Sequence, residues 1–221
     1  MNLTHMVRPA VEGARAGGAA PGLVLLHGRG ADEEDLMGLE GALDPRFTIV
    51  SPRAPFRFGP GYAWYNIMQI GSPDDESMKA SLDELRAFIA GLSGAYGIDP
   101  ERLYLLGFSQ GAVLSSALAM QMPEAITGVV MHSGYVPSQH TGLDLRPDAL
   151  AGKPFFVAHG KYDDVIPVTW GRDAHEYLEA AGADVVYKEY PIGHGISEES
   201  LYDLSEWLTA HLDSTLANQP K

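Results

Sequence analysis

A serine between two glycines is the first place in this sequence where residue types and spacing could support covalent chemistry. Residues 107–111 read Gly-Phe-Ser-Gln-Gly and follow the apolar run 103–106. A serine in a sharp turn between a strand and a helix stands clear of the sheet, and flanking glycines remove the Cβ atoms that would collide there. The pattern therefore predicts Ser109 as a nucleophile. Alone it is weak evidence, because a chain with 25 glycines can match it by chance.

A nucleophilic serine needs a histidine that accepts its proton and a carboxylate that orients this histidine. In a strand–turn–helix hydrolase these residues follow in the order serine, acid, histidine. Asp163 follows the apolar run 155–158, and His194 follows the run 185–190 and lies between two glycines. Asp164 satisfies the same order, so the motif leaves two candidates for the acid.

Five other histidines have a structural interpretation. His27, His132 and His159 each follow a predicted strand and are expected at the rim of the sheet. His175 and His211 fall inside predicted helices and are expected to face solvent. Only His194 meets two further conditions: it follows the acid in the sequence, and it lies between glycines that would admit a substrate. This favours the glycine-flanked histidine as the base.

A glycine-rich turn near the start of the chain could supply hydrogen bonds to a developing oxyanion. Residues 23–30 read as an apolar strand that ends in His-Gly-Arg-Gly, which is where a hydrolase of this kind places one backbone donor. We expect the N–H of Arg29 to be this donor, with Gly28 and Gly30 as alternatives. The N–H of Gln110, at the start of the helix after the serine, is the expected second donor. A phosphate cradle is disfavoured, because the Lys and Ser/Thr of a P-loop are missing.

Two adjacent aromatic residues, Trp64 and Tyr65, stand in a segment rich in proline and glycine. They could line a pocket for an acyl group, or they could fill the side of the domain, and the sequence leaves both interpretations open. The loops 59–76 and 134–152 would set the depth of such a pocket.

The segments that must position these residues alternate between short apolar runs and longer stretches of helical periodicity. This alternation predicts an α/β fold with a mostly parallel sheet flanked by helices. No gap is long enough for an inserted lid domain. We therefore expect one domain over residues 1–221, open to solvent at its site, with 1–20 and 214–221 loosely ordered. The predicted strands are Leu23–Leu26, Thr48–Val50, Leu103–Leu106, Gly128–Met131, Phe155–Ala158 and Val185–Tyr190, and the predicted helices span 33–43, 77–95, 110–121, 168–181 and 197–212.

The charge balance excludes several classes of partner. The chain has 15 Lys and Arg against 29 Asp and Glu, for a formal net charge of −14. No basic stripe is available to bind phosphates or an anionic membrane surface, so we expect neither a nucleic-acid partner nor stable membrane association. The chain has no cysteine, which excludes disulfides and thiolate chemistry. Residues 1–22 lack the continuous apolar segment of a signal peptide, which predicts a cytoplasmic protein.

Taken together, several strings resemble the phospholipase/carboxylesterase family of α/β hydrolases, which includes small bacterial carboxylesterases and acyl-protein thioesterases. In that family the acid lies four residues after the histidine of a His-Gly pair, which favours Asp163. The resemblance implies an α/β-hydrolase fold and backbone oxyanion donors at Arg29 and Gln110. The resembling strings are residues 26–30, 51–55, 63–67, 107–111 and 133–137, His159-Gly160 with Asp163 and Pro167, and Gly193-His194.

The activity that this resemblance implies is hydrolysis of short- to medium-chain acyl esters of small molecules, with no cofactor and no metal. Thioesterase or lysophospholipase activity with the same residues is the alternative. An inactive hydrolase fold used as a binding module is a more remote one, and the sequence leaves a homodimer open. Arg29 departs from the family, because members that act on lipidated proteins have an apolar residue there. A guanidinium at the rim of the site predicts a preference for a carboxylate-bearing or otherwise polar substrate.

Overall fold

A seven-stranded sheet runs through the molecule in the order β1-β3-β2-β8-β9-β10-β11. The computed structural model describes residues 2–11, 19–137 and 143–217. All neighbouring strands of the sheet pair in parallel except β1 and β3, which are antiparallel. The sheet thus has the mostly parallel arrangement that the sequence predicts. Its strands are β1 (His5–Arg8), β2 (Ala20–Leu26), β3 (Thr48–Pro52), β8 (Ile98–Phe108), β9 (Gly128–His132), β10 (Pro154–Gly160) and β11 (Asp184–Tyr190).

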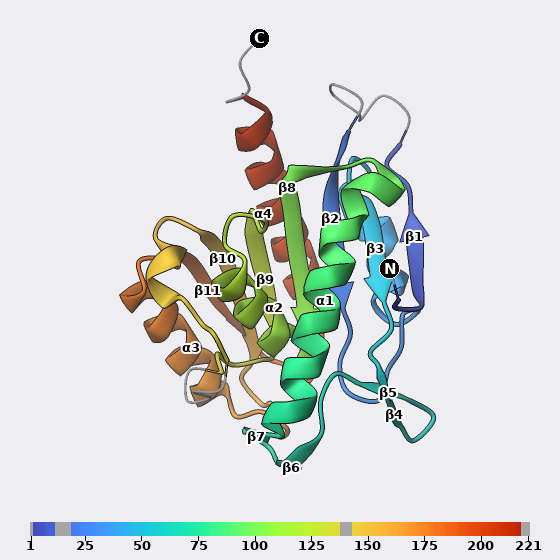
Figure 1. Ribbon diagram of the computed structural model, residues 1–221. Helices are drawn as coiled ribbons and strands as arrows, with labels where there is room; N and C mark the ends of the chain where they lie inside the picture. The colour runs from blue at the N-terminus through green and yellow to red at the C-terminus, as the bar shows by residue number, and fades with distance from the viewer. Residues whose placement is uncertain (1, 12–18, 138–142, 218–221) are drawn as a thin grey trace.

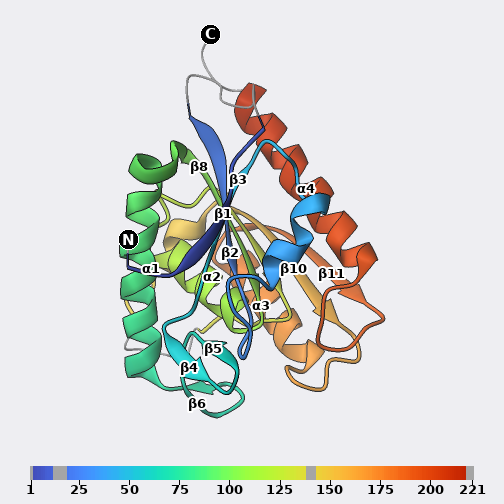
Figure 2. The ribbon, with the colours of Figure 1, turned by 90° about the vertical axis from the view of Figure 1, so that its right-hand side faces the viewer.

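Helices cover both faces of the sheet, and Figure 2 shows the sheet between α1 on one side and α4 on the other. Alternate residues of β2 point to opposite faces: Val24 belongs to the same buried cluster as Leu82 of α1, and Leu25 to that of Trp207 of α4. Burial on both faces explains why the strands read as continuous apolar runs. The helices are α1 (Asp75–Tyr96), α2 (Gln110–Gln121), α3 (Val168–Ala180) and α4 (Glu198–Ala217), with 3₁₀ helices η2 (Leu36–Ala42) and η3 (Pro147–Leu150).

Helix α1 shows how local sequence sets the ends of an element. Asp74 is its N-cap, and the carboxylate accepts a hydrogen bond of 2.9 Å from the N–H of Ser77. Gly97 ends the helix in a left-handed conformation, with φ of 64°. Caps of these two types satisfy backbone groups that the helix itself leaves unpaired. The predicted helix over 77–95 is confirmed and extends slightly at both ends.

Three expectations about regular structure are wrong. The helix expected over 33–43 is only the short 3₁₀ helix η2, which contains Gly38 and Gly41, residues that weaken an α-helix. Within 1–20, expected to be loosely ordered, strand β1 pairs with β3. Within 214–221, residues 214–217 continue α4. The remaining parts of these two segments, residues 1, 12–18 and 218–221, lie outside the described residues, as do 138–142 of the expected irregular loop.

Two small hairpins lie between β3 and α1, at the end of the molecule away from the C-terminus (Figure 1). The sequence does not predict them. One hairpin is joined to the loop after β2 through an antiparallel bridge between Ala31 and Tyr62. The hairpins consist of β4 (Phe56–Phe58) with β5 (Gly61–Ala63), and β6 (Ile67–Gln69) with β7 (Ser72–Pro73).

Parallel topology brings the predicted chemical residues to one edge of the sheet. Arg29 follows β2, Ser109 follows β8, Asp163 follows β10 and His194 follows β11. Since these four strands run in the same direction, their carboxyl ends open toward a common site.

Candidate active site

Ser109 occupies the turn between β8 and α2 in a backbone conformation that residues with a side chain rarely adopt. Its φ and ψ are 54° and −117°. The turn is fixed on both sides: the N–H of Ser109 donates to the carbonyl of His132 at 3.0 Å, and its own carbonyl accepts from Ala112 at 3.0 Å. Strain of this kind persists only where the surroundings impose it, and it is concentrated at functional sites.

The glycines that flank the serine are required by close backbone approach. A Cβ atom on Gly107 would lie 2.3 Å from the carbonyl oxygen of Gly111. A Cβ atom on Gly111 would lie 1.8 Å from the carbonyl oxygen of Leu26, at the end of β2. The Gly-x-Ser-x-Gly pattern therefore has the steric reason that the sequence suggested.

His194 connects the serine to a carboxylate. Its Nε2 lies 3.0 Å from Oγ of Ser109 and can accept the serine proton. Its Nδ1 donates to Oδ2 of Asp163 at 2.7 Å. The imidazole is partly exposed, with 17% of its side-chain surface accessible, and its ring packs 4.9 Å from that of Phe108. The base is thus held on one side and reachable from solvent on the other.

Asp163 is the carboxylate that meets the histidine, and its side chain is fully buried. Its second oxygen, Oδ1, accepts from the N–H groups of Val165 at 2.9 Å and Ile166 at 2.8 Å. These bonds orient the free face of the carboxylate toward His194. The neighbouring Asp164 is exposed, so the geometry favours Asp163 of the two candidates.

Three of the other histidines are fully buried beside the strands that precede or contain them. His27 accepts a hydrogen bond of 3.1 Å from the N–H of Ala54, and burial lowers its pKa. His159 donates to the carbonyl of Ile166 at 2.8 Å, and burial lowers its pKa as well. Burial, aided by the neighbouring histidines, lowers the pKa of His132 to about 3. All three rings are therefore neutral near pH 7, consistent with structural roles.

The two helical histidines are only half-buried rather than simply facing solvent. His175 stacks on Tyr187 with 4.9 Å between ring centroids. His211 lies 4.2 Å from the ring of Trp207 and bonds its carbonyl oxygen at 2.8 Å. The expectation of solvent-facing rings overlooked these aromatic neighbours, which come from tertiary packing and from the preceding helical turn.

The expected oxyanion donors are the backbone N–H groups of Arg29 and Gln110. Within the described residues neither has a hydrogen-bond acceptor, and both residues line the same pocket as Ser109 and His194. The N–H of Gly30 is engaged, because it donates to the carbonyl of Tyr62 at 2.7 Å. Gly28, the other alternative, is not among the described residues that line the pocket.

Hairpin β4–β5 holds the loop that carries Arg29. Besides the bond from Gly30, the N–H of Tyr62 donates to the carbonyl of Ala31 at 2.8 Å. A Cβ atom on Gly61 would lie 2.0 Å from the carbonyl oxygen of Gly30, so only glycine permits this approach. The donor loop is therefore fixed by residues about thirty positions further along the chain.

The side chain of Gln110 hydrogen bonds to the backbone of Trp64 and Tyr65 and so connects these residues to the turn that carries Ser109. Its Oε1 accepts from the N–H of Trp64 at 2.9 Å, and its Nε2 donates to the carbonyl of Tyr65 at 2.8 Å. The indole N–H of Trp64 donates in turn to the carbonyl of His27 at 2.8 Å. These bonds join the loops after β2, β5 and β8 into one unit.

A pocket of about 270 Å³ opens above the serine. Tyr65 lines it, and burial with a neighbouring tyrosine, Tyr135, raises the pKa of the Tyr65 hydroxyl. Trp64 does not line it among the described residues; it is fully buried in the core. Both aromatic side chains pack in the core, and Tyr65 also borders the pocket. The residues that line the pocket are Arg29, Phe58, Tyr65, Ile67, Ile70, Gly71, Ser109, Gln110, Tyr135, Val165, Ile166 and His194.

Sequence reasoning expected the loops 59–76 and 134–152 at the pocket, but it named few of the wall residues. Ile67, Ile70 and Tyr135 lie in these loops, whereas Phe58 and Val165 lie outside them. One signal could have located the first hairpin: Gly-Pro-Gly at residues 59–61, a turn sequence between aromatic residues.

Across residues 2–11, 19–137 and 143–217, no group of three or more His, Asp or Glu side chains is arranged to hold a metal ion. Among the helices of the same residues, none combines the length and the apolar character needed to cross a membrane.

Comparison with known proteins gives related sequences and folds. A probable carboxylesterase from Oryza sativa subsp. japonica is 31% identical over 159 residues, covering 69% of this chain and 59% of the rice protein. This chain thus spans about three fifths of that relative. Acyl-protein thioesterase 1 from Kluyveromyces lactis is 33% identical over 158 residues, covering 68% of this chain and 69% of the yeast protein.

A solved structure confirms the fold. The carboxylesterase of Bacillus cereus superposes with a TM-score of 0.81 at 23% identity, and the match covers 95% of each chain. The α/β-hydrolase fold that the resemblance implied is therefore correct. The family model described as Phospholipase/Carboxylesterase matches residues 10–212. On this match, the chain belongs to the phospholipase/carboxylesterase family.

Proposed function

We propose that the protein is a serine hydrolase of carboxylic esters, with Ser109 as nucleophile, His194 as base and Asp163 as the orienting acid. One observation carries the proposal: His194 bridges Ser109 at 3.0 Å and Asp163 at 2.7 Å at the floor of a pocket. A nucleophile, a base and an orienting group in hydrogen-bond sequence are what acyl transfer requires.

The first half of the reaction acylates the serine. Nε2 of His194 takes the hydroxyl proton as Oγ of Ser109 attacks the ester carbonyl carbon, and the carbonyl π electrons move to oxygen. The N–H groups of Arg29 and Gln110 stabilise the resulting oxyanion, while Asp163 stabilises the imidazolium. The tetrahedral intermediate collapses, the bond to the alcohol oxygen breaks, and His194 gives its proton to the leaving alcohol.

The second half repeats the same chemistry with water. His194 removes a proton from water, whose oxygen attacks the acyl carbon of the Ser109 ester. The oxyanion forms again at the same two backbone donors. When the intermediate collapses, the bond to Oγ breaks, His194 returns the proton to the serine, and the carboxylic acid leaves.

The size and chemistry of the pocket support small ester substrates. Its volume is about 270 Å³, and several walls are apolar, including Phe58, Ile67 and Ile70. A pocket at the lower limit of typical ligand sites suits a short- to medium-chain acyl ester. A cytoplasmic location and the absence of a nucleic-acid partner stay predictions of the sequence, which leaves a homodimer open.

Thioester hydrolysis is the second candidate activity. The similarity to an acyl-protein thioesterase supports it, since the match covers 68% of this chain. The same residues would cleave either bond, because both substrates pass through the same tetrahedral oxyanion. Hydrolysis rates for an oxygen ester and a thioester of butyric acid with matched leaving groups would separate the two preferences.

Hydrolysis of 4-nitrophenyl butyrate by the wild type and by Ser109→Ala tests the main proposal. We expect the variant to lose about four orders of magnitude or more in kcat/KM. Ser116→Ala is the matched control, because Ser116 is a buried serine of α2 whose hydroxyl donates to the carbonyl of Val113 at 2.8 Å. Equal rates for wild type and Ser109→Ala would overturn the triad. Absence of activity in both would favour the binding-module interpretation.

A further inference from the structure

The exposed side chain of Arg29 lines the pocket, and its guanidinium has no acidic partner among the residues that the structure describes. Resting on the proposed function, we infer that this side chain is an anion-binding subsite, which selects esters with a free carboxylate near the scissile bond. Half-esters of short dicarboxylic acids are the corresponding substrate class. The role concerns the side chain of Arg29 and is separate from that of its backbone N–H.

The position of the guanidinium is fixed by stacking. Its Cζ lies 3.8 Å from the centroid of the Phe58 ring, at the end of β4. The backbone on either side is held as well, because Gly30 and Ala31 hydrogen bond with Tyr62 of the same hairpin. An arginine stacked on an aromatic face keeps its N–H groups free at its edge for a carboxylate. The side chain therefore needs little reordering to bind an anion.

Several arginines of the described chain are paired with carboxylates. Arg46 lies 2.7 Å from Asp44, and Arg172 lies 2.6 Å from Glu189. Arg29 forms no ion pair with any residue that the structure describes, although acidic residues outnumber basic ones in the chain. Its guanidinium is therefore available for a carboxylate of the substrate.

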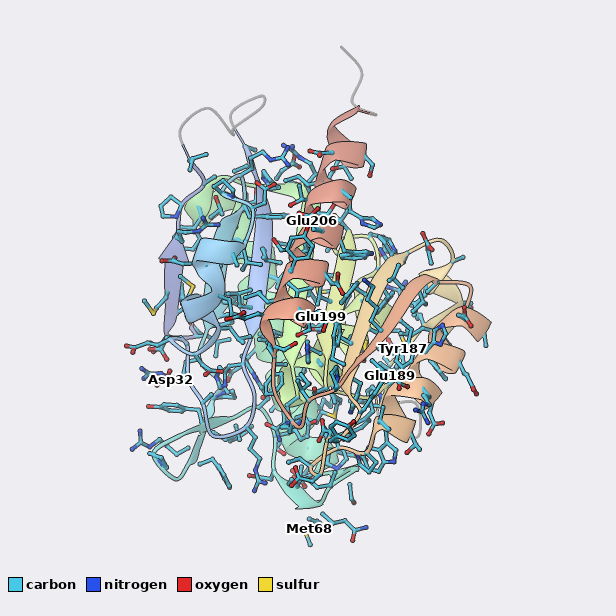
Figure 3. The ribbon with its side chains drawn as sticks, turned by 180° about the vertical axis from the view of Figure 1, so that it is seen from behind. Asp32, Met68, Tyr187, Glu189, Glu199 and Glu206 are labelled. Carbon is cyan, nitrogen blue, oxygen red and sulfur yellow. The ribbon has the colours of Figure 1, made fainter. Side chains whose placement is uncertain are left out.

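The acidic residues nearest to Arg29 in sequence are engaged elsewhere. Asp32 accepts from the N–H of Glu34 at 3.0 Å, and Glu33 pairs with Arg53. In Figure 3, Asp32 lies on the outer surface, as does Glu199 on α4.

The pocket itself is electrostatically suited to an anion. Among its described lining residues there is no Asp or Glu, and Arg29 is its permanent cation. Arg29 itself is exposed, so a substrate carboxylate would be held by charge-assisted hydrogen bonds to the planar guanidinium rather than through burial. The N-terminus of α2, beside Ser109, adds a partial positive charge. A neutral ester carries no net charge that could pair with the guanidinium.

A pair of substrates isolates the carboxylate. The probes are 4-nitrophenyl hydrogen glutarate and its neutral counterpart, 4-nitrophenyl methyl glutarate, with spontaneous hydrolysis subtracted. The measured quantity is the ratio of kcat/KM for the acidic ester to kcat/KM for the neutral ester. This ratio cancels any difference in the fraction of active protein between variants.

Arg29→Leu is expected to lower the ratio about 10- to 100-fold, the effect of losing a charged hydrogen bond. Arg29→Lys should retain part of the preference, because it keeps the charge but loses the planar fork. Added salt should lower the wild-type ratio.

The matched control is Arg57→Leu, which removes the same charge one residue before Phe58. Arg57 hydrogen bonds to the Tyr62 hydroxyl and is not among the described pocket residues, so its loss should change the ratio less than about twofold.

Two failures can be told apart. If the wild type hydrolyses the neutral ester in a Ser109-dependent manner but Arg29→Leu and Arg57→Leu give the same ratio as the wild type, the anion subsite is overturned and the proposed function stands. If neither ester is hydrolysed in a Ser109-dependent manner, both are overturned.

Discussion

The two sides of the site are built differently. Asp163 and His194 lie in short loops that follow β10 and β11, so each is positioned by the strand just before it. The opposite side is assembled from distant segments: the loop with Arg29 is hydrogen bonded to hairpin β4–β5, and Gln110 fastens the segment of Trp64. The residues of the acid–base side are thus positioned by segments next to them in sequence, and those of the pocket side by contacts between distant segments.

This difference separates chemistry from selectivity. A loop that directly follows a parallel strand places its functional group at the same edge of the sheet, independently of the conformation of the pocket wall. The wall on the other side depends on contacts between loops, which can change without moving the triad. We expect changes on the acid–base side to act on the rate of acyl transfer, and changes on the pocket side to act on substrate binding and on stability.

The largest effect is expected on the acid–base side, from Asp163→Asn. The amide cannot hold the correct histidine tautomer or stabilise its cation, and an equivalent change in a serine protease lowers kcat about 10⁴-fold. Steady-state kinetics with 4-nitrophenyl butyrate should show a fall of about 10³- to 10⁴-fold in kcat with a small change in KM.

The adjacent Asp164→Asn is the matched control for this loop. Its side chain is exposed, so kcat should stay within about threefold of the wild type. The reversed result, with Asp164→Asn inactive and Asp163→Asn active, would show that Asp164 is the acid.

A smaller effect is expected on the pocket side, from Gln110→Ala. The variant keeps the backbone donor but leaves the N–H of Trp64 and the carbonyl of Tyr65 without their partner, at a cost of about 1–3 kcal/mol in unfolding free energy. Urea unfolding should register this loss, and KM for the neutral ester should rise as the wall loosens. Unchanged stability and KM would mean that the long-range contact does not hold the wall.

The smallest effect at pH 7 concerns the buried histidine behind the site, whose contribution appears only as the pH falls. Burial lowers the pKa of His132 to about 3, whereas the same ring in the unfolded chain takes up a proton near pH 6.5. The unfolded state therefore binds more protons in this interval, so stability is full above pH 6.5 and is lost as the pH falls toward 3. Each such histidine contributes a slope of up to about 1.4 kcal/mol per pH unit.

Urea unfolding of the wild type and of His132→Asn between pH 7 and pH 4 measures this contribution. The variant should show a shallower loss of stability with falling pH. Ser116→Ala, which removes a buried hydroxyl of α2 and no titratable group, is the control and should keep the wild-type slope. Parallel pH profiles for wild type and His132→Asn would contradict the neutral buried state of His132.

The sequence predicted the acid–base side well, because its signals are local. The apolar run before Ser109, the glycines around it and the order of the later residues all reflect contacts within a few positions along the chain. The choice of Asp163 over Asp164 rested on family spacing alone. The structural reason, the N–H groups of Val165 and Ile166 on Oδ1, could not be read from composition.

The pocket side could not be predicted to the same extent. Strand β1 pairs with the distant β3, and the three-residue strands of hairpin β4–β5 are too short for a clear periodic pattern. Trp64 and Tyr65 are both buried, and which of them also borders the pocket is a tertiary property. The segment at 33–43 misled the prediction, because it suggested an α-helix where the structure has the short 3₁₀ helix η2 with two glycines, which weaken an α-helix.

Covalent trapping of the nucleophile tests the central claim most directly. The protein is treated with diethyl 4-nitrophenyl phosphate, which phosphorylates an activated serine with release of 4-nitrophenol, and the product is mapped by peptide mass spectrometry. We predict one diethylphosphoryl group per chain, on Ser109, with loss of esterase activity in proportion to labelling and no labelling of Ser109→Ala. Labelling of a different residue together with loss of activity, or inactivation that leaves Ser109 unmodified, would contradict the account.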